Sequence, residues 1–159
     1  MTVNDILVLV RQRLNDMQKI TFSDAELLYC LNNAMDELCE ELAEQNSPEI
    51  LKELKALETE PFILPDDFIA WQGQYPLEYK TNDDNQTVVS LMGPNWDGDE
   101  PTLKYYASKK HFTSMQETIP FRTLLQKQAL MKMCVRQIKG DSNDGKGTAQ
   151  AGGGAGTAQ

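Results

Sequence analysis

Apolar residues recur at steps of three and four along the first 45 positions, with polar residues between them. This spacing predicts two amphipathic helices, one over residues 3–17 and one over residues 23–45. Ser23 followed by Glu26 has the spacing of a capping box, which favours a helix start at that point. The loop between the helices is short, so we expect them to run antiparallel. The first apolar face is Val3, Ile6, Leu7, Val10, Leu14 and Met17, and the second is Leu27, Leu31, Ala34, Met35, Leu38 and Leu42.

Two more helices are predicted further along the chain. Pro48 suits a first helical turn, and the apolar spacing that follows predicts a helix over 48–57. The last helix is predicted over 120–139, with Gly140 as its stop. Both the first and the last helix carry basic residues on the side expected to face solvent. These are Arg11 and Arg13 in the first, and Arg122, Lys127, Lys132, Arg136 and Lys139 in the last.

The middle of the chain changes to strand-like texture. Segments rich in Val, Leu, Thr and Tyr predict strands over 76–80, 87–92 and 102–107. Turn-forming residues separate them at 81–86 and 93–101. We therefore expect a small antiparallel sheet or hairpin inserted between the helices.

The longer of these loops carries Trp96 between Asn95 and Asp97. A large aromatic side chain on a polar loop is typical of a contact with another chain, and packing back onto its own sheet is the equal alternative. Asn95, Asp97 and Asp99 alternate as in the start of a calcium loop. The glycine that should follow is missing, Pro101 stands in the wrong place and no glutamate closes the loop, so we expect no calcium site.

Together these elements predict an α+β fold that is mainly α: an antiparallel helical bundle with a small inserted antiparallel β-sheet or hairpin. A length of 159 residues fits one domain, placed at 1–140. A Gly/Ala/Thr/Gln-rich extended tail follows at 141–159, in which Gly-Thr-Ala-Gln occurs at 147–150 and again at 156–159. Such a tail cannot bury apolar surface and should be flexible when alone.

The charge of the chain is uneven. The formal net charge is −9, made of −8 over residues 1–60, −5 over 61–118 and +4 over 119–159. An acidic body is a poor binder of nucleic acid, because phosphate contacts need Lys and Arg. The basic last part could meet an acidic partner, including the front half of another copy, while charges balanced within one chain are the plainer alternative. No stretch is apolar enough to predict a membrane span or a signal peptide.

Residues suited to chemistry are few. His111 is the one histidine, and no serine or cysteine nucleophile motif lies near it in sequence. Cys30, Cys39 and Cys134 lack metal-type spacing and fit buried free thiols. Cys30 and Cys39 lie about 13 Å apart along one predicted helix, too far for a disulfide. We expect no enzyme activity, no metal and no cofactor.

The order of these features resembles the head–tail connector proteins of tailed bacteriophages, also called adaptor or head-completion proteins. The resemblance covers roughly residues 3–140. Its most specific part is the run Arg-x-Arg-Leu-Asn-Asp, then Phe-Ser-Asp-Ala-Glu-Leu-Leu, then Leu-Asn-x-Ala. A Leu-Pro-Asp-Asp-Phe segment, strands ending in Leu-Lys-Tyr-Tyr-Ala and a helix opening with Ile-Pro-Phe-Arg complete the order.

The resemblance implies a structural protein without catalysis. The head–tail connector proteins form a ring, commonly a dodecamer, beneath the portal protein of the capsid. They extend the DNA channel and carry the next tail or nozzle protein. Double-stranded DNA would pass without specific binding, no membrane would be involved, and the protein, made in the host bacterial cytoplasm, would lie at the head–tail junction of the virion.

The resemblance also suggests contact residues. The tail would reach the portal, acidic and basic helix faces would meet between neighbours, and the Trp96 loop would touch a neighbour or a tail component. The candidate portal contacts are Gly147, Thr148, Ala149, Gln150, Gly156, Thr157, Ala158 and Gln159. The candidate subunit contacts are Arg122, Lys127, Lys132, Arg136, Glu37 and Glu41, and the candidate loop contacts are Asn95, Trp96 and Asp97.

A second reading belongs to another class. A small cytoplasmic helical regulator or binding module with an acidic surface would engage a basic partner as a monomer or dimer, and its tail would stay disordered. The mass of the protein in solution, alone and with a portal ring, separates the two readings.

Overall fold

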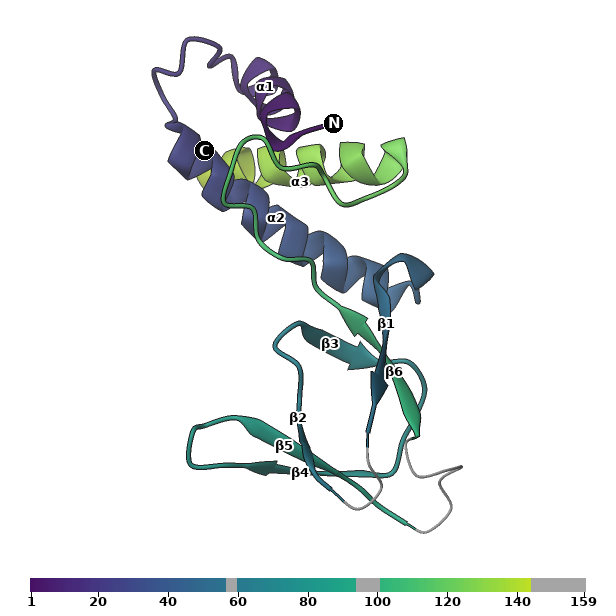
Figure 1. The fold of residues 1–159 in the computed structure, drawn as a ribbon. Helices are drawn as coiled ribbons and strands as arrows, with labels where there is room; N and C mark the ends of the chain where they lie inside the picture. Colours follow the sequence, from purple (N-terminus) through teal and green to yellow (C-terminus); the bar gives the residue numbers. More distant parts are fainter. Residues whose placement is uncertain (57–59, 94–100, 144–159) are drawn as a thin grey trace, which may run out of the picture. The chain divides into compact units, whose positions relative to one another are not determined.

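The computed structural model describes residues 1–56, 60–93 and 101–143. This part of the chain holds three α-helices and two three-stranded antiparallel sheets (Figure 1). It divides into two compact units, and the predicted domain over 1–140 includes residues of both. Unit 1 contains residues 1–38 and 111–143, and unit 2 contains residues 39–110.

Helix α1 (Val3–Leu14) begins at a capping box and ends at a left-handed residue. The Thr2 hydroxyl accepts the Asp5 N–H at 3.2 Å, and the Asp5 carboxylate accepts the Thr2 N–H at 2.8 Å. Asn15 has φ 55° and caps the last turn through its N–H. The predicted extension to Met17 is therefore wrong, because a left-handed residue ends the helix first.

Helix α2 (Asp24–Glu44) starts where the sequence predicts. The Ser23 hydroxyl accepts the Glu26 N–H at 3.1 Å, and the Glu26 carboxylate accepts the Ser23 N–H at 3.0 Å. The predicted capping box is confirmed, and the predicted apolar face is buried from Leu27 to Leu42.

Helix α3 (Leu124–Asn143) begins four residues later than predicted and runs through Gly140. The start is set by another capping pair. The Thr123 hydroxyl accepts the Gln126 N–H at 3.1 Å, and the Gln126 side chain accepts the Thr123 N–H at 3.4 Å. The prediction of a helix over 120–139 misses this pair. Gly140 does not stop the helix, since a glycine ends one only where the backbone turns left-handed.

In unit 1 the helices bury a shared apolar core. α1 packs on α3, and the segment before α3 joins the N-terminus through the bond of the Val3 N–H to the Glu117 carbonyl, 2.9 Å. Asn32 ties the same segment to α2: its amide donates to the Phe112 carbonyl at 3.1 Å and accepts the Phe112 N–H at 2.7 Å. The fully buried side chains of unit 1 include Val3, Ile6, Val10, Leu27, Leu31, Met35, Phe121, Leu130 and Cys134.

Unit 2 corrects the prediction of a third helix over 48–57. One 3₁₀ turn (Pro48–Ile50) is followed by strand β1 (Leu51–Lys55). β1 pairs antiparallel with β6 (Thr102–Ala107), so that Leu51 faces Tyr106 and Leu54 faces Leu103. The backbone hydrogen bonds of this distant pairing outweigh the local helical spacing, which is a weak preference by comparison.

Two sheets make up the β-structure of unit 2, with orders β1-β6-β3 and β2-β5-β4. The predicted strands are confirmed as β4 (Leu77–Thr81), β5 (Thr87–Leu91) and β6. The prediction lacks β2 (Phe62–Ile63) and β3 (Phe68–Trp71), which are short and separated by Pro65.

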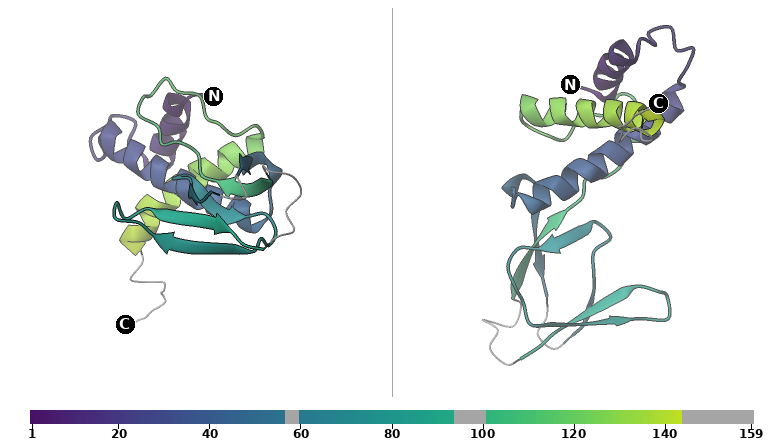
Figure 2. Two further views of the ribbon diagram at one scale, coloured as in Figure 1. Left: turned by 60° about the horizontal axis from the view of Figure 1, so that its bottom comes forward. Right: turned by 180° about the vertical axis from the view of Figure 1, so that it is seen from behind.

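The predicted fold class is therefore wrong. The described residues do not form a helical bundle with a small insertion, because unit 2 holds six strands in two sheets and half of the predicted helix over 48–57 is strand β1. The further views show the β4–β5 hairpin of unit 2, which belongs to the sheet with order β2-β5-β4 (Figure 2).

Candidate interaction surfaces

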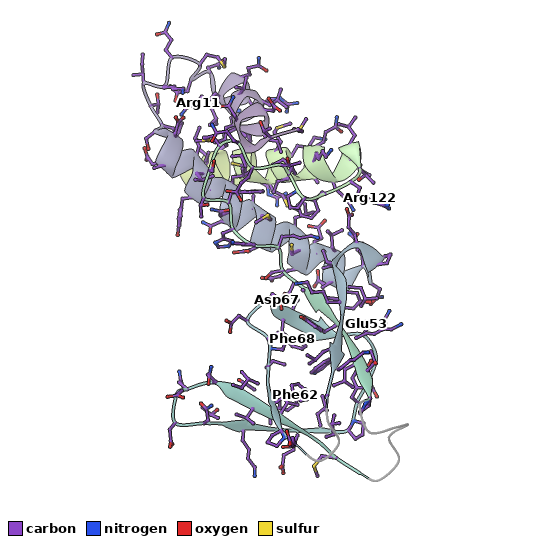
Figure 3. The ribbon with its side chains drawn as sticks, in the orientation of Figure 1. Arg11, Glu53, Phe62, Asp67, Phe68 and Arg122 are labelled. Atoms are coloured by element: carbon purple, nitrogen blue, oxygen red, sulfur yellow. The ribbon has the colours of Figure 1, made fainter. Side chains whose placement is uncertain are left out.

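The loop between α1 and α2 is held by a buried ion pair. Arg11 is 3% exposed and Asp16 is 4% exposed, and a guanidinium nitrogen of Arg11 donates to the Asp16 carboxylate at 2.9 Å. Arg11 also donates to the Phe22 carbonyl at 2.9 Å and to the Asp24 carboxylate at 2.8 Å. The expectation that Arg11 faces solvent is wrong, since these acceptors draw it inward at the loop end of α1 (Figure 3).

The Asp16 carboxylate organises the loop from within. It accepts the main-chain N–H groups of Ile20 and Thr21 at 2.9 Å and of Phe22 at 3.0 Å. The Thr21 N–H, with the other two and Arg11, holds the pKa of Asp16 below its ordinary value, against the opposing effect of burial. A charged carboxylate with this many donors fixes the course of the loop backbone.

The tip of this ordered loop carries exposed apolar side chains. Ile20 is 79% exposed and Met17 is 52% exposed. Beside them the loop surrounds an open hollow of about 400 Å³. The residues around the hollow are Asn15, Asp16, Met17, Gln18, Ile20 and Thr21. A loop fixed from inside thus presents apolar surface outside.

A second exposed apolar pair opens α3. Leu124 is 62% exposed and Leu125 is 76% exposed, in the first turn that follows the Thr123 cap. Both are fixed by the regular backbone of a helix. Leu130, further along the same helix, is fully buried. The core face of α3 therefore does not include its first turn.

Two acidic side chains of α2 in unit 1 have partners within the chain. Arg136 donates to Glu37 at 3.1 Å, and His111 lies 2.8 Å from the Asp36 carboxylate. All four side chains are substantially exposed, so each pair contributes about 0–1 kcal/mol. Two of the candidate subunit contacts thus meet each other in one copy.

The other candidate subunit contacts form no ion pair with one another among the described residues. Arg122 lies just before α3, at the labelled position in Figure 3. Lys132 and Glu41 are exposed and Lys127 is half-buried, and these three have no ion pair among the residues that the structure describes. Lys132 lies one helical turn from Arg136 on α3, and Glu41 lies one turn from Glu37 on α2.

The aromatic residues of unit 2 form a cluster over β3, β4 and β6. Trp71 lies 4.8 Å from Phe68 and 5.6 Å from Tyr75, measured between ring centroids. The indole N–H of Trp71 donates to the Tyr79 hydroxyl at 2.8 Å, which joins the two sheets. Tyr105 donates to Asp67 at 3.1 Å, and burial with that carboxylate raises the pKa of Tyr105 to about 12. Much of the cluster is half-buried, and it serves as the core of a small unit.

A basic hollow of about 290 Å³ lies beside the junction of β1 and β6. Three of its side chains are lysines, and Lys52 is already paired with Asp67 at 2.5 Å. Its residues are Glu49, Ile50, Leu51, Lys52, Ala107, Ser108, Lys109 and Lys110. Lysines on a surface hollow with an acidic neighbour do not define a ligand.

The candidate portal contacts and the candidate loop contacts lie outside the described residues. Over the residues that are described, no group of three or more side chains is arranged to hold a metal ion. No helix in this same part of the chain is long and apolar enough to cross a membrane.

Sequence reasoning did not find that Ile20, Leu124 and Leu125 are exposed. Ile20 falls in a segment assigned to a loop, where apolar spacing carries no information. Leu124 and Leu125 have the apolar spacing of the last predicted helix, 120–139, which alone does not separate them from its buried residues. The Thr-x-x-Gln spacing at Thr123 and Gln126 was the available signal, because it places the two leucines in the first turn, before the buried stripe.

No protein-family model matches the chain, and no curated protein is significantly similar to it.

Proposed function

We propose that this protein is a non-catalytic structural subunit that associates with copies of itself in the head–tail connector ring of a tailed bacteriophage. The observation that carries the proposal is the exposure of large apolar side chains on rigid backbone at Ile20, Leu124 and Leu125. Scattered exposed apolar residues are ordinary, but pairs held on an internally braced loop and a helical turn are typical of contact surfaces. The order of elements that resembles connector proteins gives the class of assembly.

The charge of the chain supports a channel role. A net charge of −9 offers DNA few phosphate contacts, so double-stranded DNA can pass a ring of such subunits without specific binding. The ring would dock under the portal protein, extend the DNA channel and carry the next tail or nozzle protein. It would lie at the head–tail junction of the virion.

The test is the mass of the purified chain over a concentration series, followed by electron microscopy of any large species. We expect a concentration-dependent species with cyclic symmetry and an open centre. A chain that stays monomeric at every concentration contradicts the proposal. A portal ring added in a second series then tests docking.

The acidic stretch at the end of α2 favours a second candidate. Glu40, Glu41 and Glu44 are exposed and form no ion pair among the described residues. A cytoplasmic binding module could use this stretch to engage a basic partner. Binding of a polylysine probe by a monomer that forms no ring, with loss on substitution of the three glutamates by glutamine, would favour this candidate.

A further inference from the structure

Two apolar surfaces of unit 1 have the properties of a complementary pair. The loop surface consists of Met17 and Ile20, and the helix-start surface consists of Leu124 and Leu125. Each presents two large apolar side chains that the core of unit 1 does not use. We propose that the loop surface of one copy packs on the helix-start surface of the next copy, an inference that rests on the proposed ring and names its contact.

The loop surface is ordered before any partner arrives. Arg11 and Asp16 are almost fully buried, and between them they bond to main-chain groups of residues 20–22. Binding to a preorganised surface loses less conformational entropy than binding to a mobile loop. Burial of ions at this site is more costly than burial of apolar side chains would be. The buried Arg11–Asp16 pair holds Met17 and Ile20 in a fixed position at the tip of the loop.

One copy cannot bring its own two surfaces together. Figures 1 and 2 place the loop and the start of α3 at opposite ends of unit 1. α3 has 20 residues, so its two ends lie about 30 Å apart. A contact between the two surfaces therefore joins different copies.

Such a contact is heterologous, because the two copies use different surfaces. A heterologous contact leaves one free surface of each kind at the two ends of any open chain of subunits, so it adds copies, and it ends in a ring where the rotation between neighbours closes. A loop-to-loop contact would instead stop at a dimer.

Charge beside the two surfaces favours this pairing. Glu26, in the first turn of α2 next to the loop, is exposed, and Lys127 lies one turn into α3. Neither forms an ion pair among the described residues, the Glu26 carboxylate accepts the Ser23 N–H, and Lys19 of the loop is paired with Asp24. Opposite charges at the rim of an apolar contact set its orientation more than its affinity.

The experiment uses the full chain and two paired variants. Met17→Ser with Ile20→Ser removes the loop surface, and Leu124→Ser with Leu125→Ser removes the helix-start surface. Ile63→Ser is the matched control, because Ile63 is a 50% exposed apolar residue in unit 2. Helicity and the unfolding midpoint of each variant are measured first, and little change is expected because the substituted side chains are exposed.

Sedimentation velocity then gives the outcome. We expect each paired variant to weaken self-association by at least about 100-fold, from the loss of two apolar side chains at the contact, while the control assembles like the unsubstituted chain. Mixing the two variants leaves one intact surface of each kind, so the mixture should form a dimer of one copy of each and stop there.

Each other result counts against the inference in a distinct way. Rings that persist in both paired variants overturn the contact and leave the proposed ring standing. Variants that fail alone and also fail to pair when mixed overturn the loop-to-helix contact in favour of another arrangement. An unsubstituted chain that remains monomeric overturns the ring, and the contact with it.

Discussion

Replacement of Arg11 by Met tests whether the buried ion pair braces the α1–α2 loop. Methionine retains most of the aliphatic packing of arginine but removes the donors to Asp16, Phe22 and Asp24. Removing one partner of a buried pair costs about 3–5 kcal/mol. The Asp16 carboxylate keeps its three main-chain donors, so we expect the lower end, about 3 kcal/mol.

The assay is thermal unfolding followed by the helical circular dichroism signal. For a chain of this size, about 3 kcal/mol corresponds to a fall in Tm of about 6–12 °C. Asp24→Asn is the control, because Asp24 is about half exposed and its pair with Arg11 should contribute less than about 1 kcal/mol. If Arg11→Met costs no more than the control, the pair does not brace the loop and the reasoning fails.

Three further predictions concern single groups. The Thr21 N–H leads the interactions that lower the pKa of Asp16, so this carboxylate stabilises the fold fully above its ordinary pKa of 3.8, and the contribution is lost as the pH falls through the lower folded value. Urea unfolding below pH 3.8 should therefore depend less on pH in Asp16→Asn. Asn32→Ala leaves the N–H and carbonyl of Phe112 without their partner, and should cost about 1–3 kcal/mol and speed hydrogen exchange at that amide. Burial raises the pKa of Cys134 to about 12, so mass spectrometry after alkylation at neutral pH should find this thiol unmodified in the native protein and modified after unfolding.

Features that are fixed by residues close together in the sequence were predicted correctly. The start of α2 is correct because Ser23 and Glu26 bond to each other across three residues. β4, β5 and β6 are correct because turn-forming residues bound them on the chain itself. The start of α3 could have been predicted in the same way, from the Thr123–Gln126 capping spacing. The apolar spacing of the segment led the predicted helix to begin too early.

What depends on distant partners could not be predicted in this way. Leu51 and Leu54 have the spacing of a helix, and only pairing with β6 makes them a strand. Arg11 has the position of an outward residue on α1, and only the return of the loop through Asp16, Phe22 and Asp24 supplies its acceptors. The loop surface follows from this second fact, so no pattern in residues 15–22 predicts it.

Unit 1 is assembled from two segments, residues 1–38 and 111–143, with all of unit 2 between them. During synthesis α1 and α2 leave the ribosome long before α3, the helix on which α1 packs. Their apolar faces therefore wait without that partner while the strands of unit 2 emerge, a period in which a chaperone or a premature contact could intervene. If unit 2 folds during this interval, it shortens the loop that must close and lowers the entropy lost when α3 docks. The β-unit would then act as a folding aid for the helical unit, and the completed helical unit would be the last part of each copy to form.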